Sequence, residues 1–360
     1  MPKTRFPLAA LALALSLGAM MSAAEAATYV YVSNADSREI FVMEMNSQNG
    51  DLTLTERVPV AGTVMPMVVS HDKKHLYAAL RSQPYAVASF NIDPASGKLT
   101  ALKSGDLADS MANIDLDRTG KWLFAASYGG NKVTVSPVNA DGTIGATKQI
   151  MATQPNAHAI HTDPANRYAF ASNLGGDVVL SLHFDAATGV LKRNEASDIN
   201  FPPKSGPRHF VFHPNGRFVY LIDELDAKLH VYSYDAGKGA WSELQVEDTL
   251  PPGSKVTPWA ADLHFTPDGR YLYGSERNSS TISGWKVDAQ TGRVTLISHT
   301  PTQKEPRGFN IDPSGHYLLA VGQASHAMST YAINADGTLK LLKEYGMGKN
   351  PNWVEIITFP

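Results

Sequence analysis

A short motif that recurs six times constrains the fold more than any other feature of the sequence. Each copy is a polar turn that leads into an apolar strand, and the copy at 266–273 reads TPDGRYLY. The copies lie at residues 70–77, 117–124, 163–170, 213–220, 266–273 and 312–319, so their last residues are 46 to 53 positions apart. A period of this length with several short strands per unit is typical of a β-propeller. The repeat therefore predicts an all-β fold in which each unit is one blade.

A second turn recurs late in most units. It reads ASGKL, ADGTI, ATGVL, QTGRV and ADGTL at residues 95–99, 140–144, 187–191, 290–294 and 335–339. Glycine at the centre of such a turn supplies the positive φ that tight hairpins need. We expect these turns to join the two outer strands of a blade.

The two ends of the chain together supply a seventh unit. Residues 29–34, YVYVSN, match the second strand of a unit, and residues 351–356, PNWVEI, match a first strand. The C-terminal strand is therefore expected to become the inner strand of blade one, which closes the ring and leaves no open sheet edge there. The prediction is a single domain over residues 27–360, a seven-bladed propeller with four-stranded antiparallel blades.

The first 26 residues have the features of an export signal. Lys3 and Arg5 precede an apolar stretch from Phe6 to Met21, and Ala24-Glu25-Ala26 is a small-x-small cleavage pattern. The apolar stretch is shorter than the ~20 residues of a comfortable membrane span. We expect cleavage before Ala27, a periplasmic location, and no membrane insertion after cleavage.

Composition excludes several classes of function. The formal net charge is −3, which gives no basis for binding nucleic acid or an anionic membrane. There is no cysteine, so a thiol nucleophile and a cysteine-ligated metal site are excluded. No Gly-x-Ser-x-Gly nucleophile elbow occurs either.

Alignment of the units places polar residues on one rim of the channel. In antiparallel neighbours the start of the first strand and the end of the second lie at the same end of the propeller. The two positions are 16 residues apart in each unit: Met65/Arg81, Ala112/Tyr128, His158/Leu174, Arg208/Glu224, Ala261/Arg277 and Arg307/Gln323, with Asn352/Ala35 from the split blade. Charged and polar groups that converge in a concavity are the usual pattern of a functional site.

The predicted catalytic residues are Glu224, His158, Arg208 and Arg277. Arg208 should keep Glu224 ionised, and either that carboxylate or a neutral His158 can activate water. Arginines can stabilise an oxyanion or hold a product carboxylate. The predicted substrate-binding residues are Arg307, Gln323, Arg81, Tyr128 and Asn352. A purely structural Glu224–Arg208 ion pair remains an alternative.

Two further features are predicted to be structural. Asp262 and His264 share a strand face, but two ligands without a clear third are poor evidence for a metal site, so no metal is predicted. His209 follows Arg208 and should face away from the channel by strand alternation.

Several stretches in this chain resemble a known family. GPRHFVFHPN at 206–215, DEL at 223–225, PRGFN at 306–310, MPMVVS at 65–70 and WAAD at 259–262 resemble the seven-bladed propeller lactonases, which include 6-phosphogluconolactonases and carboxymuconate-lactonising enzymes. The resemblance covers essentially all of residues 27–360. It implies a site built from a His, a Glu and arginines, matching His158, Glu224, Arg208, Arg277 and Arg307, and it implies no cofactor.

The resemblance implies a carboxylic-ester hydrolase whose partner is a small sugar lactone. Together with the export signal it implies a periplasmic gluconolactonase of the pseudomonad type, acting on glucono-1,5-lactone. Hydrolysis of 6-phosphogluconolactone, a lactonising cycloisomerase and a non-catalytic binding scaffold remain alternatives. Nothing in the sequence determines the oligomeric state.

Overall fold

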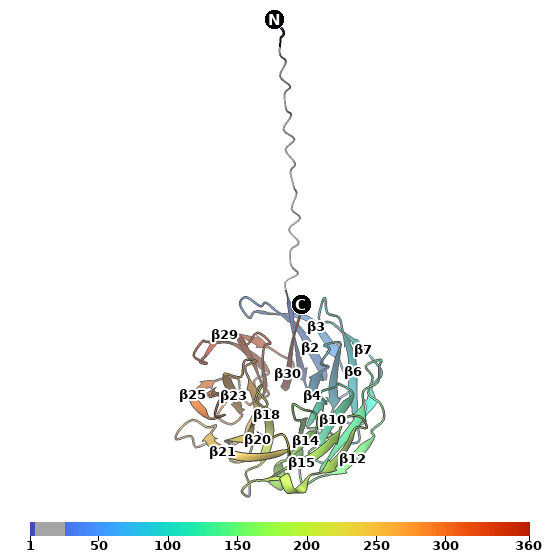
Figure 1. Ribbon diagram of the computed structural model, residues 1–360, viewed down its shortest axis with the longest axis vertical. Helices are drawn as coiled ribbons and strands as arrows, with labels where there is room; N and C mark the ends of the chain where they lie inside the picture. The colour runs from blue at the N-terminus through green and yellow to red at the C-terminus, as the bar shows by residue number, and fades with distance from the viewer. Residues whose placement is uncertain (4–25) are drawn as a thin grey trace.

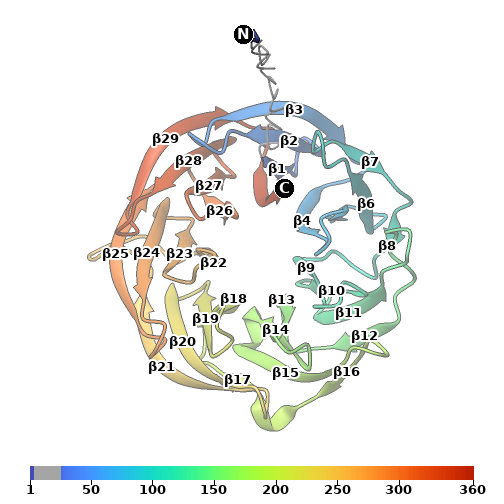
Figure 2. The same cartoon turned by 45° about the horizontal axis from the view of Figure 1, so that its top comes forward.

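Seven antiparallel sheets surround a central channel, as the repeat predicts (Figures 1 and 2). The computed structural model describes residues 1–3 and 26–360. The predicted export signal falls on residues 4–25 and so lies outside the described residues. No helix in the described part of the chain is long and apolar enough to cross a membrane.

Each blade is a sheet whose first strand lines the channel. Blade one consists of β30 (Pro351–Phe359), β1 (Ala27–Asn34), β2 (Glu39–Met45) and β3 (Leu52–Pro59). Blade two consists of β4 (Val64–Val69), β5 (His75–Leu80), β6 (Ala86–Ile92), β7 (Leu99–Ala101) and β8 (Gly105–Asp106). Blade three consists of β9 (Asn113–Leu116), β10 (Trp122–Ser127), β11 (Lys132–Pro137) and β12 (Gln149–Ala152). Blade four consists of β13 (Ala157–Thr162), β14 (Tyr168–Asn173), β15 (Val178–Asp185), β16 (Val190–Arg193) and β17 (Ile199–Asn200), with short 3-10 helices at Leu174–Gly176 and Glu195–Ser197.

The remaining three blades have four strands each. Blade five consists of β18 (Pro207–Phe212), β19 (Phe218–Asp223), β20 (Lys228–Asp235) and β21 (Ala240–Asp248). Blade six consists of β22 (Ala260–Phe265), β23 (Tyr271–Glu276), β24 (Thr281–Val287) and β25 (Val294–Pro301). Blade seven consists of β26 (Pro306–Ile311), β27 (Tyr317–Gly322), β28 (Ala327–Ile333) and β29 (Leu339–Gly346).

The predicted closure of the ring is confirmed. The C-terminal strand β30 pairs antiparallel with β1, with Tyr29 opposite Ile357 and Val32 opposite Val354. Figure 2 shows β30 as the inner strand of the first blade, beside the C-terminus. The first and the last strand of the propeller therefore share one sheet, which holds the ring shut without a disulfide.

The hydrophobic core lies between adjacent blades, and the two sequence repeats meet there. Val30 and Val32 of blade one pack in one cluster with Leu319 and Val321 of blade seven. At three of the aligned aromatic positions, a tyrosine hydroxyl donates to the glycine carbonyl in the outer hairpin of the next blade. The pairs are Tyr31 to Gly97 at 2.9 Å, Tyr220 to Gly292 at 2.5 Å and Tyr273 to Gly337 at 2.8 Å. The repeated turn and the repeated strand thus fix the angle between neighbouring blades.

A β-bulge interrupts the start of several inner strands. In β18, Pro207 pairs with Asp223 and His209 with Ile222, so Arg208 is the extra residue. The same irregularity makes His158 the extra residue in β13 and Arg307 the extra residue in β26. Because a bulge adds one residue to the strand, it breaks the alternation of side chains and re-aims them.

The bulge makes one prediction wrong. His209 lines the channel together with Asp262 and Trp353, and its ring centroid lies 5.9 Å from that of Trp353 in blade one. Simple alternation placed His209 on the opposite side because it did not allow for the extra residue at Arg208. Arg208 and His209 therefore both lie toward the centre of the propeller. Arg208 pairs with Glu224 of the pocket described below, and His209 lines the channel.

Candidate active site

A pocket of about 220 Å³ opens where the inner strands begin and the second strands end. A volume below the ~300–1,000 Å³ of typical ligand pockets suits a single small ring. It is lined by Arg81, Ala112, Tyr128, His158, Glu224, Trp259, Arg277 and Arg307, which come from six blades. Six of the nine predicted site residues are in this lining, and Arg208 pairs with one of them from below.

Glu224 is the centre of a buried ionic network. Its Oε2 accepts a hydrogen bond from Nε of Arg208 at 2.9 Å and forms an ion pair with Nη2 of Arg277 at 2.8 Å. Its Oε1 accepts from Nε1 of Trp259 at 3.2 Å. Arg208 and Arg277 are 1% and 2% exposed, so both guanidinium groups depend on this carboxylate and on nearby carbonyls for partners.

The backbone of blade six completes the network. Arg208 donates to the carbonyl of Ala261, and Arg277 donates to those of Trp259 and Ala260 at 3.0 and 3.1 Å. The Arg277 guanidinium also lies 3.9 Å from the centroid of the Trp259 ring, which is a cation–π contact. The result is a rigid arrangement in which Glu224 is held on several sides.

The ionic network keeps Glu224 charged. Burial alone would raise the pKa of its carboxyl, but Arg208, Arg277 and Arg307 outweigh burial and hold the pKa below its ordinary value. Three donors already occupy the carboxylate oxygens. Such a carboxylate is a weak proton acceptor and a strong anchor for arginines.

His158 differs from Glu224 in having no hydrogen-bond partner among the described residues. It is 3% exposed, and its Nδ1 is buried and unpaired, which leaves Nε2 as the nitrogen that can reach the pocket. Burial and the charges of Arg208, Arg307 and Arg277 hold the pKa of His158 well below its ordinary value. The imidazole is therefore neutral near pH 7 and carries one free lone pair.

Arg307 is the other unpaired group of the pocket. Its guanidinium forms no hydrogen bond or ion pair with any side chain or carbonyl in the described part of the chain. Desolvation and the neighbouring charges of Arg208, Arg277 and Arg81 lower its pKa well below the ordinary value. An arginine stays protonated at neutral pH, so Arg307 offers several free donors to an anion.

Arg81 and Tyr128 form the opposite wall. Nε of Arg81 donates to the Ser110 hydroxyl at 3.0 Å, which fixes one edge of the guanidinium. Tyr128 lies edge-on to His158 with ring centroids 6.0 Å apart. Burial raises the pKa of the Tyr128 phenol, followed by the charge of Glu224, so the hydroxyl remains a donor.

Two predicted site residues do not line the pocket. The Gln323 amide donates to Oδ1 of Asn350 at 2.6 Å. Asn352 is fully buried and contacts Ser33 of β1 and the Val64 carbonyl of blade two. Both residues occupy the aligned positions, but their contacts join neighbouring loops and blades.

One pocket residue with a polar side chain, Trp259, was not among the predicted site residues. Trp259 precedes β22 by one residue, and it supplies both a donor to Glu224 and the aromatic face under Arg277. The repeat alignment selects only the first position of each inner strand, and Trp259 lies two residues before that position. The sequence signal that could have identified Trp259 is its position in WAAD, one of the stretches that resemble the propeller lactonases.

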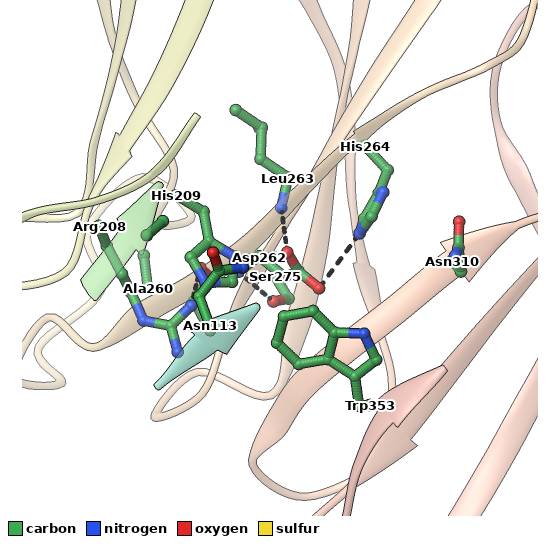
Figure 3. A network of polar contacts seen from close by, with 12 residues as sticks. Asn113, Arg208, His209, Ala260, Asp262, Leu263, His264, Ser275, Asn310 and Trp353 are labelled. Carbon is green, nitrogen blue, oxygen red and sulfur yellow. Dashed lines mark hydrogen bonds and ion pairs between the residues drawn. The ribbon is translucent and has the colours of Figure 1, made fainter. Parts of the chain in front are cut away.

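The channel below the pocket has a different chemistry. It encloses about 290 Å³ and is lined in part by Asp115, His161, His209, Asp262 and His264. Asp262 binds His209 at 2.8 Å and His264 at 3.2 Å (Figure 3), which confirms the predicted polar contact of Asp262 with His264. Among the described residues, no group of three or more acidic or histidine side chains is arranged to hold a metal ion.

Comparisons with known proteins agree with this architecture. The model of the family "Lactonase, 7-bladed beta-propeller" matches residues 26–356. The 6-phosphogluconolactonase of Pectobacterium carotovorum subsp. carotovorum (strain PC1) is 40% identical over 329 residues, covering 91% of this chain and 98% of the relative. That of Yersinia pestis (strain Pestoides F) is 38% identical over 328 residues, covering 91% and 97%.

A solved structure of similar architecture comes from Pseudomonas aeruginosa. Its periplasmic gluconolactonase superposes with a TM-score of 0.86 at 26% identity, covering 92% of this chain and all of that one. The family match and the sequence relatives both extend over nearly the whole described propeller. The chain therefore belongs to the seven-bladed β-propeller lactonases, and it is a lactone-hydrolysing enzyme.

Proposed function

We propose that this lactonase hydrolyses the six-membered ring ester of an aldonic acid, glucono-1,5-lactone, to gluconate. The observation that carries the proposal is the imbalance of charge in the pocket. Arg81, Arg277 and Arg307 line it, and Glu224 is the single carboxylate among the described lining residues. Such a pocket favours a substrate whose reaction creates negative charge, first on an oxyanion and then on a carboxylate.

In the proposed reaction His158 acts as the base. Nε2 of His158 takes a proton from water as the water oxygen bonds to the lactone carbonyl carbon. Arg307, whose donors are free, stabilises the oxyanion that forms. The carbonyl then re-forms, the ring C–O bond breaks, and the proton passes from His158 to the leaving ring oxygen. The new carboxylic acid loses its own proton to solvent.

Glu224 is assigned a holding role rather than that of the base. Its oxygens already accept hydrogen bonds from Arg208, Arg277 and Trp259. Proton transfer to it would discharge the carboxylate that forms ion pairs with both buried guanidinium groups. The neutral and unpaired His158 has no such cost, which favours it as the base.

The periplasm is the proposed location. The proposal is supported by the positive, apolar and small-residue pattern of residues 1–26 and by the structural likeness to a protein named as a periplasmic gluconolactonase. An unphosphorylated lactone is the substrate that this location favours. The second candidate, 6-phosphogluconolactone, is supported by the names of the 40% and 38% identical relatives and by Arg81, which is a further cation for a phosphate.

A pH-stat assay on both lactones tests the proposal. Purified protein lacking residues 1–26 is given each lactone, and the spontaneous hydrolysis rate is subtracted. We expect enzymatic acid release from glucono-1,5-lactone that saturates with substrate concentration. We also expect kcat/KM to be higher on this lactone than on 6-phosphogluconolactone. A preference for the phosphorylated lactone would replace the first candidate with the second, and no release from either would contradict an aldonolactone substrate.

The location is tested separately by cell fractionation with N-terminal sequencing of the recovered protein. We expect it in the periplasmic fraction, beginning at Ala27. Recovery from the cytoplasm with residues 1–26 intact would contradict the proposed location without affecting the assay above.

A further inference from the structure

Two adjacent buried imidazole rings at the base of the pocket each carry a nitrogen without a partner. These nitrogens are Nδ1 of His158 and Nε2 of His209, and neither has a hydrogen-bond partner among the described residues. The two rings are in contact, with centroids 5.1 Å apart and planes inclined at 62°. Buried polar atoms nearly always have a partner, so two unpaired nitrogens on touching rings need a common explanation.

Asp262 determines which nitrogen of His209 carries the proton. Oδ1 of Asp262 lies 2.8 Å from Nδ1 of His209, and the carboxylate is also held by the Leu263 amide at 3.0 Å and by His264 (Figure 3). His264 and His209 outweigh burial and keep the pKa of Asp262 well below its ordinary value. A carboxylate can only accept, so the proton of His209 lies on Nδ1.

The remaining nitrogen of His209 is therefore an acceptor. Burial and then the charge of Arg208 lower the pKa of His209 to about 3, so the ring holds a single proton near neutral pH. With that proton on Nδ1, Nε2 presents a bare lone pair. A donor on His158 would satisfy it, either directly or through one bridging water.

We propose that Asp262 and His209 are positioning residues that hold the proton of His158 on Nδ1 and so present its Nε2 to the lactone. This inference rests on the proposed role of His158 as the base. Asp262 in blade six contacts His209 in blade five, and His209 contacts His158 in blade four. Each contact joins the inner strands of neighbouring blades. In the described structure, His209 forms no hydrogen bond with Glu224 or with the arginines that line the pocket. We therefore expect its effect on the reaction to pass through His158.

The proton balance of the reaction is compatible with this arrangement. When Nε2 of His158 takes the proton from water, Nδ1–H stays directed to Nε2 of His209, and the negative charge of Asp262 offsets the new positive charge. When the ring C–O bond breaks, the Nε2 proton goes to the leaving oxygen and His158 is neutral again. No other reactant is needed.

The channel offers a matched control for this relay. Asp115 binds Nδ1 of His161 at 2.6 Å, so it is a second carboxylate–histidine pair on the same channel. The His161 ring packs edge-on against Phe210, at 5.1 Å between centroids. Asp115→Asn therefore removes a similar pair without changing the contact between His209 and His158.

The first test is a double-mutant cycle in the full-length enzyme with the pH-stat assay. We expect Asp262→Asn to lower kcat by roughly 10- to 100-fold, the effect typical of losing the orienting partner of a functional histidine, with KM little changed. In the His158→Gln background the same substitution should have almost no further effect. Asp115→Asn should leave kcat within about twofold.

The outcomes separate the two proposals. If His158→Gln alone kept the wild-type kcat, the proposed role of His158 would fail. If His158→Gln were slow and Asp262→Asn still lowered kcat by its full factor in that background, only the relay would be overturned. A loss in Asp115→Asn equal to that in Asp262→Asn would also overturn the relay, because any carboxylate–histidine pair of the channel would then have the same effect.

The second test is made on the wild-type protein, so it remains valid even if the Asp262→Asn variant does not fold. Nitrogen-15 chemical shifts of the wild-type imidazoles report which nitrogen of each ring is protonated, and His158→Gln and His209→Gln identify the two signals by their loss. We expect neutral rings protonated on Nδ1 in both residues near pH 7. A His158 ring protonated on Nε2 would overturn the proposal.

Discussion

The mouth of the channel and its interior use the same residue types in opposite ways. In the interior, the Asp115–His161 contact at 2.6 Å, the Asp262–His209 contact at 2.8 Å and the Trp353–Glu355 contact at 2.8 Å all pair a donor with an acceptor. At the mouth, three arginines face one carboxylate, and Arg307 and His158 have no hydrogen-bond partner in the described structure.

This difference separates groups that hold one another in place along the channel from groups that await a ligand. An uncompensated polar group away from water lowers stability, so a fold retains one where a ligand completes it. The Asp115–His161 and Asp262–His209 pairs of the interior join inner strands of different blades around the channel. The incomplete mouth has the donors and the lone pair that hydrolysis of a lactone requires.

Removing the C-terminal strand has the largest expected effect on both regions. Deletion of residues 350–360 removes Trp353 and Glu355 from the channel but no residue of the pocket lining. We still expect loss of activity together with poor solubility and a markedly lower Tm, because β1 loses its partner and the ring opens. A truncated protein with the Tm and activity of the full-length form would show that the two regions do not depend on one closed ring.

Glu224→Gln tests the compensated part of the mouth. The variant leaves Arg208 and Arg277 buried without their counter-charge, and breaking a buried ion pair costs roughly 3–5 kcal/mol, with Gln toward the lower end because it can still accept hydrogen bonds. We expect a lower free energy of unfolding in urea and a raised KM as the arginines shift. A variant of unchanged stability whose turnover falls by about two orders of magnitude or more would instead identify Glu224 as the base.

Arg307→Ala tests the uncompensated part. Loss of this free cation should reduce kcat/KM by about 10- to 100-fold, in line with a charge-assisted contact to an anion, with little change in stability. Arg118→Ala is the matched control, since Arg118 lines the channel but already donates to the Thr162 carbonyl at 3.2 Å. Equal losses in both variants would contradict the distinction between mouth and interior.

A smaller effect is expected from Glu355 in the interior. Burial raises the pKa of its carboxyl from 4.5 to about 7, so the folded state binds a proton more tightly than the unfolded chain. This stabilisation is complete below about pH 4.5 and is lost as pH rises through 7. At pH 8 the free energy of unfolding of Glu355→Gln, measured in urea, should therefore exceed that of wild type by on the order of 1–3 kcal/mol. At pH 4.5 the two proteins should be equally stable. A variant less stable at pH 8 would contradict the raised pKa.

The repeat made the fold and much of the mouth predictable. Units of constant length place the first position of each inner strand at one rim, and this spacing alone groups His158, Arg208, Glu224 and Arg307. The same rule misplaced His209, because a bulge changes side-chain direction without changing the spacing between units.

Other features of the site depend on contacts that spacing does not encode. Gln323 and Asn352 occupy aligned positions, yet their partners lie in loops and blades whose exact approach decides the side-chain direction. Trp259 lies before its strand, outside the repeat. Whether Glu224 or His158 is free to act as a base depends on the number of donors around each, which the structure supplies.

The most direct test of the account compares two histidines on one strand. His158 and His161 are three residues apart on β13, the first unpaired at the mouth and the second bound to Asp115 in the channel. The measurement is kcat/KM on glucono-1,5-lactone, or on the phosphorylated lactone if that is preferred, for His158→Gln and His161→Gln, each checked for folding by its Tm. We predict a loss of about 10² to 10⁴-fold for His158→Gln, the usual contribution of a general base, and at most a few-fold change for His161→Gln. Wild-type activity in His158→Gln, or a comparable loss in both variants, would contradict the account.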